Sequence, residues 1–111
     1  MTASLHDDAM TDLMETLEIT DTEERDYMGG TWVRGTIGEH RFEALVFPEH
    51  ADNPDYELDD SRISKLWVQR IEGRATVANF DRGWDVRPAT RAAERIVGIL
   101  AAGLSGIVFQ D

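Results

Sequence analysis

The stretch TWVRGTIGEHRFEALVF, residues 31–47, contains two runs of alternating side chains separated by Gly38 and Glu39. In the second run the apolar residues Phe42, Ala44 and Val46 occupy every other position. A period of two is typical of a strand with one buried and one wetter face, and a two-residue connection with glycine first is typical of a tight hairpin. The stretch therefore predicts an antiparallel hairpin with strands at 31–37 and 40–47.

A second hairpin is predicted downstream. RISKLWVQRIE, residues 62–72, and ATVANFD, residues 75–81, are rich in β-branched and aromatic residues and flank Gly73 and Arg74. Between the hairpins, PEHADNPDYELDDS at 48–61 combines two prolines, an asparagine and six acidic residues, which is typical of a loop. The simplest arrangement is a four-stranded antiparallel meander.

Helical periodicity appears at both ends of the chain. After Pro88, the segment ATRAAERIVGILAAGL places small and aliphatic residues on one side of a helix, with Pro88 suited to its first position. The apolar tail SGIVFQD either packs beneath the sheet or adds a short strand. Near the N-terminus, Met10, Leu13, Met14 and Leu17 predict a short helix over about 8–18 with an acidic outer face, docked on the domain or on a partner.

These elements predict an α+β fold in which the C-terminal helix packs on one face of the four-stranded sheet. We divide the chain into an acidic N-terminal helix and connector, residues 1–30, and a β-β-β-β-α domain, residues 31–111. Trp67 is expected beneath the helix; the alternative is a nucleic-acid stacking platform that it forms with Lys65 and Arg70.

Charge is unevenly placed along the chain, whose formal net charge is −11. Residues 1–61 contain 17 acidic and three basic residues, whereas residues 62–111 contain five acidic and eight basic residues. The acidic part repels a phosphate backbone, so direct nucleic-acid binding is not expected. It attracts a protein with a basic groove and accelerates their encounter. The alternative is that the carboxylates serve only solubility.

Known catalytic and metal-binding patterns are missing from the sequence. There is no cysteine, and the three histidines lack the spacing of metal ligands. Neither a nucleophile elbow nor a phosphate-binding glycine loop is present. We therefore expect no catalytic residue, no metal and no cofactor. The sequence also lacks a secretory signal and an apolar run of membrane-spanning length, which favours the cytoplasm.

The junction NFDRGWDVRP, residues 79–88, combines charged, aromatic and glycine residues, as a binding loop or a tight structural turn would. We interpret it as a hinge between the fourth strand and the last helix. Asp81 and Asp85 are expected to hold backbone groups, and Arg82 or Arg87 to pair with one of these two carboxylates. Gly83 supplies a positive φ, and Trp84 closes the end of the core.

Three segments carry a resemblance to a known family. TWVRGTIGEHRFEALVF, SRISKLWVQR and VANFDRGWDVRP resemble a family of small proteins from phages and bacterial mobile elements, classed as a domain of unknown function. The resemblance covers about residues 31–88 and implies no catalytic residues. It implies a context in which acidic proteins often inhibit host machinery, anti-CRISPR proteins among them. The acidic residues 1–30 lie outside it.

Charge and resemblance together predict a non-enzymatic inhibitor of a nucleic-acid-binding complex, such as a CRISPR effector, in the host bacterial cytoplasm. Its surface would mimic DNA and contact neither nucleic acid nor membrane directly. The predicted partner-binding residues are Asp8, Asp12, Glu15, Glu18, Asp52, Asp55, Glu57, Asp59 and Asp60. The alternative is a small assembly module that forms a homodimer or binds a protein partner without DNA mimicry.

Overall fold

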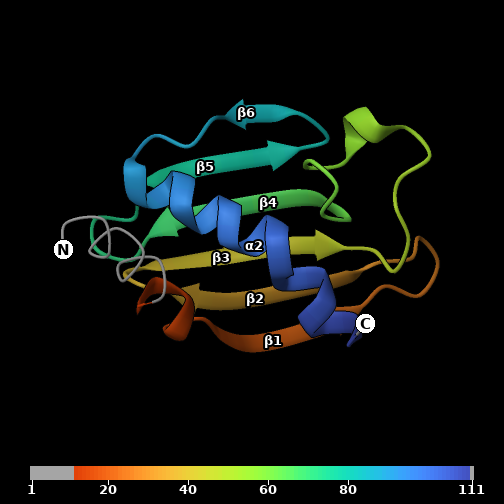
Figure 1. Cartoon of the computed structure of the whole chain (residues 1–111), viewed down its shortest axis with the longest axis horizontal. Helices are drawn as coiled ribbons and strands as arrows, with labels where there is room; N and C mark the ends of the chain where they lie inside the picture. Colours follow the sequence, from red (N-terminus) through yellow and green to blue (C-terminus); the bar gives the residue numbers. More distant parts are fainter. Residues whose placement is uncertain (1–11, 111) are drawn as a thin grey trace, which may run out of the picture.

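A computed structural model describes residues 12–110 and shows one antiparallel sheet covered on one face by a helix (Figure 1). The six strands follow one another in space in chain order, so every connection joins neighbours. The strands are β1 (Glu18–Glu24), β2 (Thr31–Ile37), β3 (His40–Val46), β4 (Ile63–Arg70), β5 (Thr76–Asp81) and β6 (Trp84–Val86). The helix is α2 (Arg91–Phe109), and a 3-10 turn, Pro54–Tyr56, lies in the loop between β3 and β4.

The prediction of a four-stranded sheet is wrong, because one further strand lies at each edge. β1 occupies the segment that we expected to be a polar connector, and β6 lies in the expected hinge before the helix. All residues of β1 except Ile19 are exposed, so the strand has no apolar alternation to reveal it. β6 is three residues long, too short for a periodic signal.

The expected acidic N-terminal helix is also wrong for the residues that the structure describes. Only residues 12–15 are helical, and the chain enters β1 at Glu18. Leu13 and Leu17 nevertheless pack against the core, and the backbone N–H of Gly38 donates a hydrogen bond to Thr16 Oγ1 at 2.7 Å. Leu13 and Leu17 of the apolar stripe therefore dock on the protein's own domain beside the β2–β3 hairpin, whereas Met14 is exposed. The first residue of the stripe, Met10, and Asp8 lie outside the described residues.

The core lies between α2 and the sheet. Side chains opposite one another in neighbouring strands point to the same face, and the row Gly35, Phe42, Val68 and Ala78 crosses the sheet on the helix side. The helix contributes a buried stripe that contains Ile96, and the apolar periodicity predicted both partners correctly. The buried residues of that stripe are Ala93, Ile96, Val97, Ile99, Leu100 and Leu104.

The opposite face of the sheet is not covered by any element within residues 12–110. Trp67 lies on this face, paired with Glu43 and Asn79, so the expectation that the helix covers it is wrong. Its ring is half-buried, and its Nε1 donates a hydrogen bond to Thr76 Oγ1 at 3.1 Å. Neighbouring side chains on the sheet thus shield the ring without a second layer.

α2 begins three residues after Pro88, because Thr90 caps it by accepting a hydrogen bond from Ala93 N at 3.0 Å. The helix continues to Phe109 and takes in the apolar tail, which therefore forms no strand. Among the described residues it is the one helix long and apolar enough to cross a membrane. Its buried stripe, however, belongs to the core. A helix that packs in a protein core can have the same length and apolar composition.

Candidate functional site

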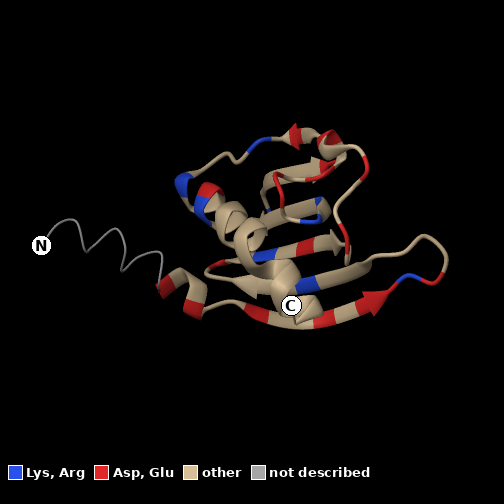
Figure 2. Cartoon of the chain, turned by 45° about the vertical axis from the view of Figure 1, so that its right-hand side comes forward, with Lys and Arg blue, Asp and Glu red and all other residues tan. Residues whose placement is uncertain are grey.

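β1 and the turn before it form an acidic border along one edge of the sheet. We call the four carboxylates of β1 the acidic edge: Glu18, Asp21, Glu23 and Glu24. All four are exposed, and Figure 2 shows them along the strand that ends the sheet. Asp12 and Glu15 precede them in the helical turn and are also exposed. Of the predicted N-terminal cluster, the structure thus places three residues at this border, while Asp8 lies outside the described residues.

Arg34 on β2 ties part of the acidic edge to the sheet. Its guanidinium lies 2.8 Å from Asp21, 3.5 Å from Glu23 and 2.6 Å from Glu43 on β3. The hydrogen bond to Glu43, followed by the one to Asp21, raises the pKa of Arg34 above its ordinary value. Because Arg34 carries one positive charge among three carboxylates, this face of the edge stays acidic.

The carboxylates of the loop at 48–61 divide into two groups. Five are exposed, and they are Glu49, Asp52, Asp55, Asp59 and Asp60. The side chain of Glu57 is only 5% exposed and accepts hydrogen bonds from Ala51 N and His50 Nδ1, each at 2.8 Å. Burial by itself raises the pKa of Glu57, but these hydrogen bonds outweigh it and hold the pKa below its usual value. Glu57 therefore fixes the loop, whereas the other five carboxylates face solvent.

The junction at 81–85 is a β-hairpin. Asp81 ends β5, Arg82 and Gly83 form the turn with φ of 54° and 144°, and Trp84 begins β6. The positive φ predicted for Gly83 is confirmed, but the segment turns into a strand instead of leading directly to the helix. The carboxylate of Asp81 lies 3.8 Å from Lys65 Nζ and 3.9 Å from Arg82 Nε. Asp81 thus faces two cations at the end of the sheet.

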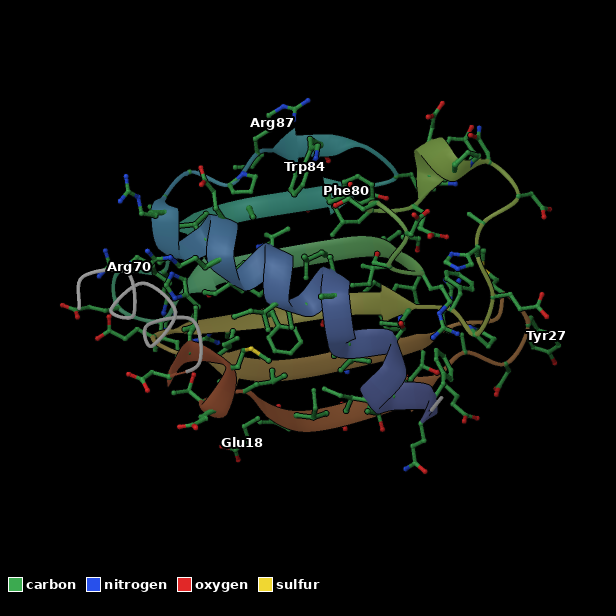
Figure 3. All side chains as sticks on the ribbon, viewed as in Figure 1. Glu18, Tyr27, Arg70, Phe80, Trp84 and Arg87 are labelled. Carbon is green, nitrogen blue, oxygen red and sulfur yellow. The ribbon has the colours of Figure 1, made fainter. Side chains whose placement is uncertain are left out.

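Trp84 closes the end of the core, as expected. Its ring packs edge-on against Phe80, with centroids 5.2 Å apart and planes at 74°, and the two rings lie side by side in Figure 3. Asp85, the next residue, is exposed in the middle of β6, away from the capped end of α2 at Thr90. The packing of Trp84 on Phe80 therefore gives this junction a structural role.

A hollow lies at the end of the sheet where β1, β3 and β5 finish. It has a volume of about 550 Å³ and is half open to solvent. The β1–β2 hairpin, the loop at 47–57 and the β5–β6 turn enclose it. We call it the cationic pocket, because its lining contains Arg25, Arg62, Lys65 and Arg82.

Each basic side chain of the cationic pocket lies against an aromatic ring. Arg25 lies 5.8 Å from the centroid of Phe47, and Arg82 lies 5.7 Å from that of Tyr56. Similar contacts join Lys65 to Trp32 at 6.0 Å and Arg62 to Phe109 at 5.7 Å. Such contacts stabilise a cation by about 0.5–1 kcal/mol at exposed sites and restrict its motion. The pocket thus presents positive charge at defined positions.

No sequence pattern predicted the cationic pocket, since its residues are spread from Arg25 to Arg82. A group of three or more metal-ligating side chains is absent from residues 12–110. His40 is buried at the opposite end of the sheet, and its Nδ1 has no hydrogen-bond partner among the described residues. Burial, assisted by the positive charge of Arg70, lowers the pKa of His40.

Comparison with protein families finds one match: the model of a domain of unknown function, DUF7678, matches residues 31–105. Comparisons with curated proteins and with solved structures find no match. The matched segment begins at the first residue of β2 and ends within α2. Most of the cationic pocket therefore lies inside the family domain, whereas the acidic edge lies outside it.

Proposed function

The chain belongs to the DUF7678 family of domains of unknown function, and we propose that it is a non-enzymatic protein that binds a basic partner through the acidic edge. One observation carries the proposal. β1 is an edge strand, exposed along nearly its whole length, that adds four carboxylates beside a family domain which begins only after it. An exposed row of negative charges accelerates the encounter with a positively charged surface and disfavours binding to an acidic surface.

The charge density of the edge limits how much DNA it can imitate. Seven residues of strand extend over about 20 Å, so the four carboxylates lie roughly 7 Å apart on average. One strand of duplex DNA carries a charge every 3.4 Å or so along its axis. The acidic edge thus has about half the linear density of a DNA strand, and Arg34 offsets part of it. This lower charge density fits contact with a short stretch of a basic groove better than contact along a long stretch.

The finer form of the proposal is inhibition of a nucleic-acid-handling complex. A carboxylate row can occupy a groove built for phosphates and so exclude nucleic acid from it. The resemblance to proteins of phages and bacterial mobile elements supports this context, in which the partner would be a CRISPR effector or another complex in the host bacterial cytoplasm. Support for this form is charge and analogy.

A homodimer formed by pairing two β1 strands is the second candidate. The outer backbone of β1 has no neighbour strand among the described residues, and such an edge can accept another strand. Pairing two copies, however, sets a row of carboxylates against the same row, and like charges on facing strands destabilise a sheet. The acidic edge therefore favours a basic partner over a second copy.

The test compares two variants that each remove four negative charges. The edge variant carries Glu18→Gln, Asp21→Asn, Glu23→Gln and Glu24→Gln. The loop variant carries Asp52→Asn, Asp55→Asn, Asp59→Asn and Asp60→Asn, on the side of the sheet where Tyr56 meets Arg82. Both variants and the unmodified chain are immobilised and exposed to bacterial lysate at low and high salt.

We expect the unmodified chain and the loop variant to capture the same DNA-binding proteins at low salt and to release them at high salt. The edge variant should capture them far less. Duplex DNA added at low salt should displace the captured proteins. Capture that is equal in all three proteins, or a tight complex that neither salt nor DNA disturbs, would contradict the proposal.

A further inference from the structure

The cationic pocket points to a second binding activity, independent of the acidic edge. We propose that it binds a small organic anion of mononucleotide size, carrying a phosphate group and a planar ring. The pocket's volume of about 550 Å³ falls within the range of roughly 300–1,000 Å³ that is usual for small-molecule sites. Most of its lining lies within the family domain, and the segment that follows β1 adds Arg25 and residues 28–30.

Positive charge in the pocket remains available to a ligand. Arg25 donates hydrogen bonds to the backbone carbonyls of Gly29 and Met28, at 2.7 and 3.5 Å, and makes no ion pair within residues 12–110. Lys65 and Arg82 share the single carboxylate of Asp81 at distances too long for a strong hydrogen bond. A phosphate group entering between these side chains would gain charge-assisted hydrogen bonds at little cost to existing ones.

Acidic residues of the pocket do not cancel this charge. Glu57 is turned toward Ala51 and His50, which satisfy its carboxylate. Glu49 and Asp52, the other two acidic residues of the lining, are exposed on the loop wall. Carboxylates at that position accept hydrogen bonds from hydroxyl or amino groups. The lining therefore offers cations for a phosphate on one side and acceptors for a sugar or a base on the other.

A planar ring is favoured by the aromatic residues of the pocket. Phe47 and Tyr56 both line it, and the guanidinium groups of Arg25 and Arg82 lie over their respective rings. Aromatic and guanidinium planes stack on nucleobases, and each stacked base is worth about 1–3 kcal/mol in single-strand binding proteins. Inorganic phosphate alone would make no stacking contact with these planes.

Backbone geometry provides a further argument for a functional role. Two of the four pocket cations, Arg62 and Arg82, have left-handed φ values of 65° and 54°. Glycine or asparagine adopts this conformation at lower cost than a long side chain. Residues held in such conformations cluster at ligand sites, where the side chain has a use that offsets the strain. The guanidinium of Arg62 donates a hydrogen bond to the backbone oxygen of Pro48 at 2.7 Å, which gives this side chain a structural use. Arginine at position 82 is better explained by binding than by stability.

The strain supplies a sharp test at Arg82. Arg82→Gly removes a pocket cation while relieving the backbone, so the variant should unfold at the same temperature as the unmodified chain or higher. Arg74→Gly is its matched control, because Arg74 has a φ of 58° in the β4–β5 turn and does not line the pocket. Lys65→Met is a second pocket variant that leaves the backbone unchanged.

The full chain and the three variants are titrated with AMP, GMP, CMP, UMP and inorganic phosphate by isothermal calorimetry. Fluorescence of the tryptophans provides a second signal, because Trp32 lies against Lys65. We expect saturable binding of at least one nucleotide, weakened about tenfold or more by Arg82→Gly and by Lys65→Met, and unchanged by Arg74→Gly. Inorganic phosphate should bind more weakly than that nucleotide.

Three results would overturn the inference. The first is that none of the four nucleotides binds saturably to the folded chain. The second is that Arg74→Gly weakens binding as much as Arg82→Gly, which would place the site elsewhere. The third is that inorganic phosphate binds as tightly as any nucleotide, which would remove the planar ring from the ligand. If Arg82→Gly fails to fold, Lys65→Met with a confirmed native melting curve decides the question.

Discussion

The acidic edge and the cationic pocket use charge in opposite ways. The edge consists of exposed carboxylates on a strand that lies outside the family domain, and one cation, Arg34, accompanies them. The pocket gathers four of the chain's eleven basic residues at one end of the sheet, each against an aromatic ring. The chain thus separates its negative and positive charges in space. Its net charge of −11 by itself would not have predicted a pocket lined by cations.

Removing β1 from the sheet would test whether the two regions are structurally independent. A Cβ at Gly35 would clash with the backbone oxygen of Glu18 and come within 2.9 Å of the Phe42 ring. We expect Gly35→Ala to lower the free energy of unfolding by about 3 kcal/mol, because backbone cannot yield as a flexible side chain does. Chemical denaturation measures this loss, and hydrogen exchange should show β1 amides losing protection while those of β4 keep it.

Gly98→Ala is the matched control for this substitution. Gly98 lies in α2, and a Cβ there meets nothing within 4 Å. Because alanine favours the helix, the control should raise stability by about 0.5–1 kcal/mol. Equal stability of Gly35→Ala and the unmodified chain would show that β1 does not pack as described.

Glu57 provides the corresponding test on the pocket side. Glu57→Ala leaves the Ala51 N–H and His50 without their acceptor, so we expect a loss of about 2 kcal/mol and faster hydrogen exchange in the loop at 48–61. Protection of β1 should not change. Glu57→Gln keeps an acceptor and should lose less; if the two variants are equally stable, the hydrogen bonds do not hold the loop.

The same residue predicts an acid-sensitive contribution to stability. Because the pKa of Glu57 is lower in the folded chain than its usual 4.5, the stabilisation is present above that value. It is lost as pH falls below 4.5 through the folded pKa. Unfolding of the unmodified chain should therefore depend more steeply on pH in this range than unfolding of Glu57→Gln.

A smaller pH effect is expected from His40, at the end of the sheet away from the pocket. Its folded pKa lies below the ordinary 6.5, because of burial and Arg70, with Glu39 acting in the opposite direction. Below about pH 6.5, His40 therefore binds a proton more readily in the unfolded chain than in the folded chain. The free energy of unfolding falls as pH drops through this range, by at most about 1.4 kcal/mol per pH unit. His40→Leu should flatten this slope between about pH 6.5 and pH 5; an unchanged slope would contradict the assignment.

Periodicity in the sequence was informative where one face of an element is buried. The predicted strands at 31–37, 40–47, 62–72 and 75–81 correspond to β2 through β5, because residues such as Phe42 and Leu66 face the core at every second position. The C-terminal helix was predicted for the same reason. β1 was missed because a strand exposed on both faces has no such pattern, and β6 because three residues are too few.

The acidic edge and the cationic pocket also differ in how far the sequence predicted them. The exposed carboxylates of the loop and of the N-terminal segment were visible as composition, although Glu57 proved to be buried in the loop. The cationic pocket could not be predicted, since three chain segments meet there and the left-handed backbone of Arg62 and Arg82 has no signature in residue type. Glycine or asparagine at these two positions would have indicated a left-handed φ, whereas arginine does not.

The most direct test of the separation of charge is one crossed binding experiment. The unmodified chain, the edge variant and Arg82→Gly are each measured for capture of DNA-binding proteins from lysate and for nucleotide binding by calorimetry. We predict that the edge variant loses protein capture and keeps nucleotide binding, and that Arg82→Gly does the reverse. Loss of both activities in either folded variant would contradict the account, because it would show that the acidic edge and the cationic pocket form a single site.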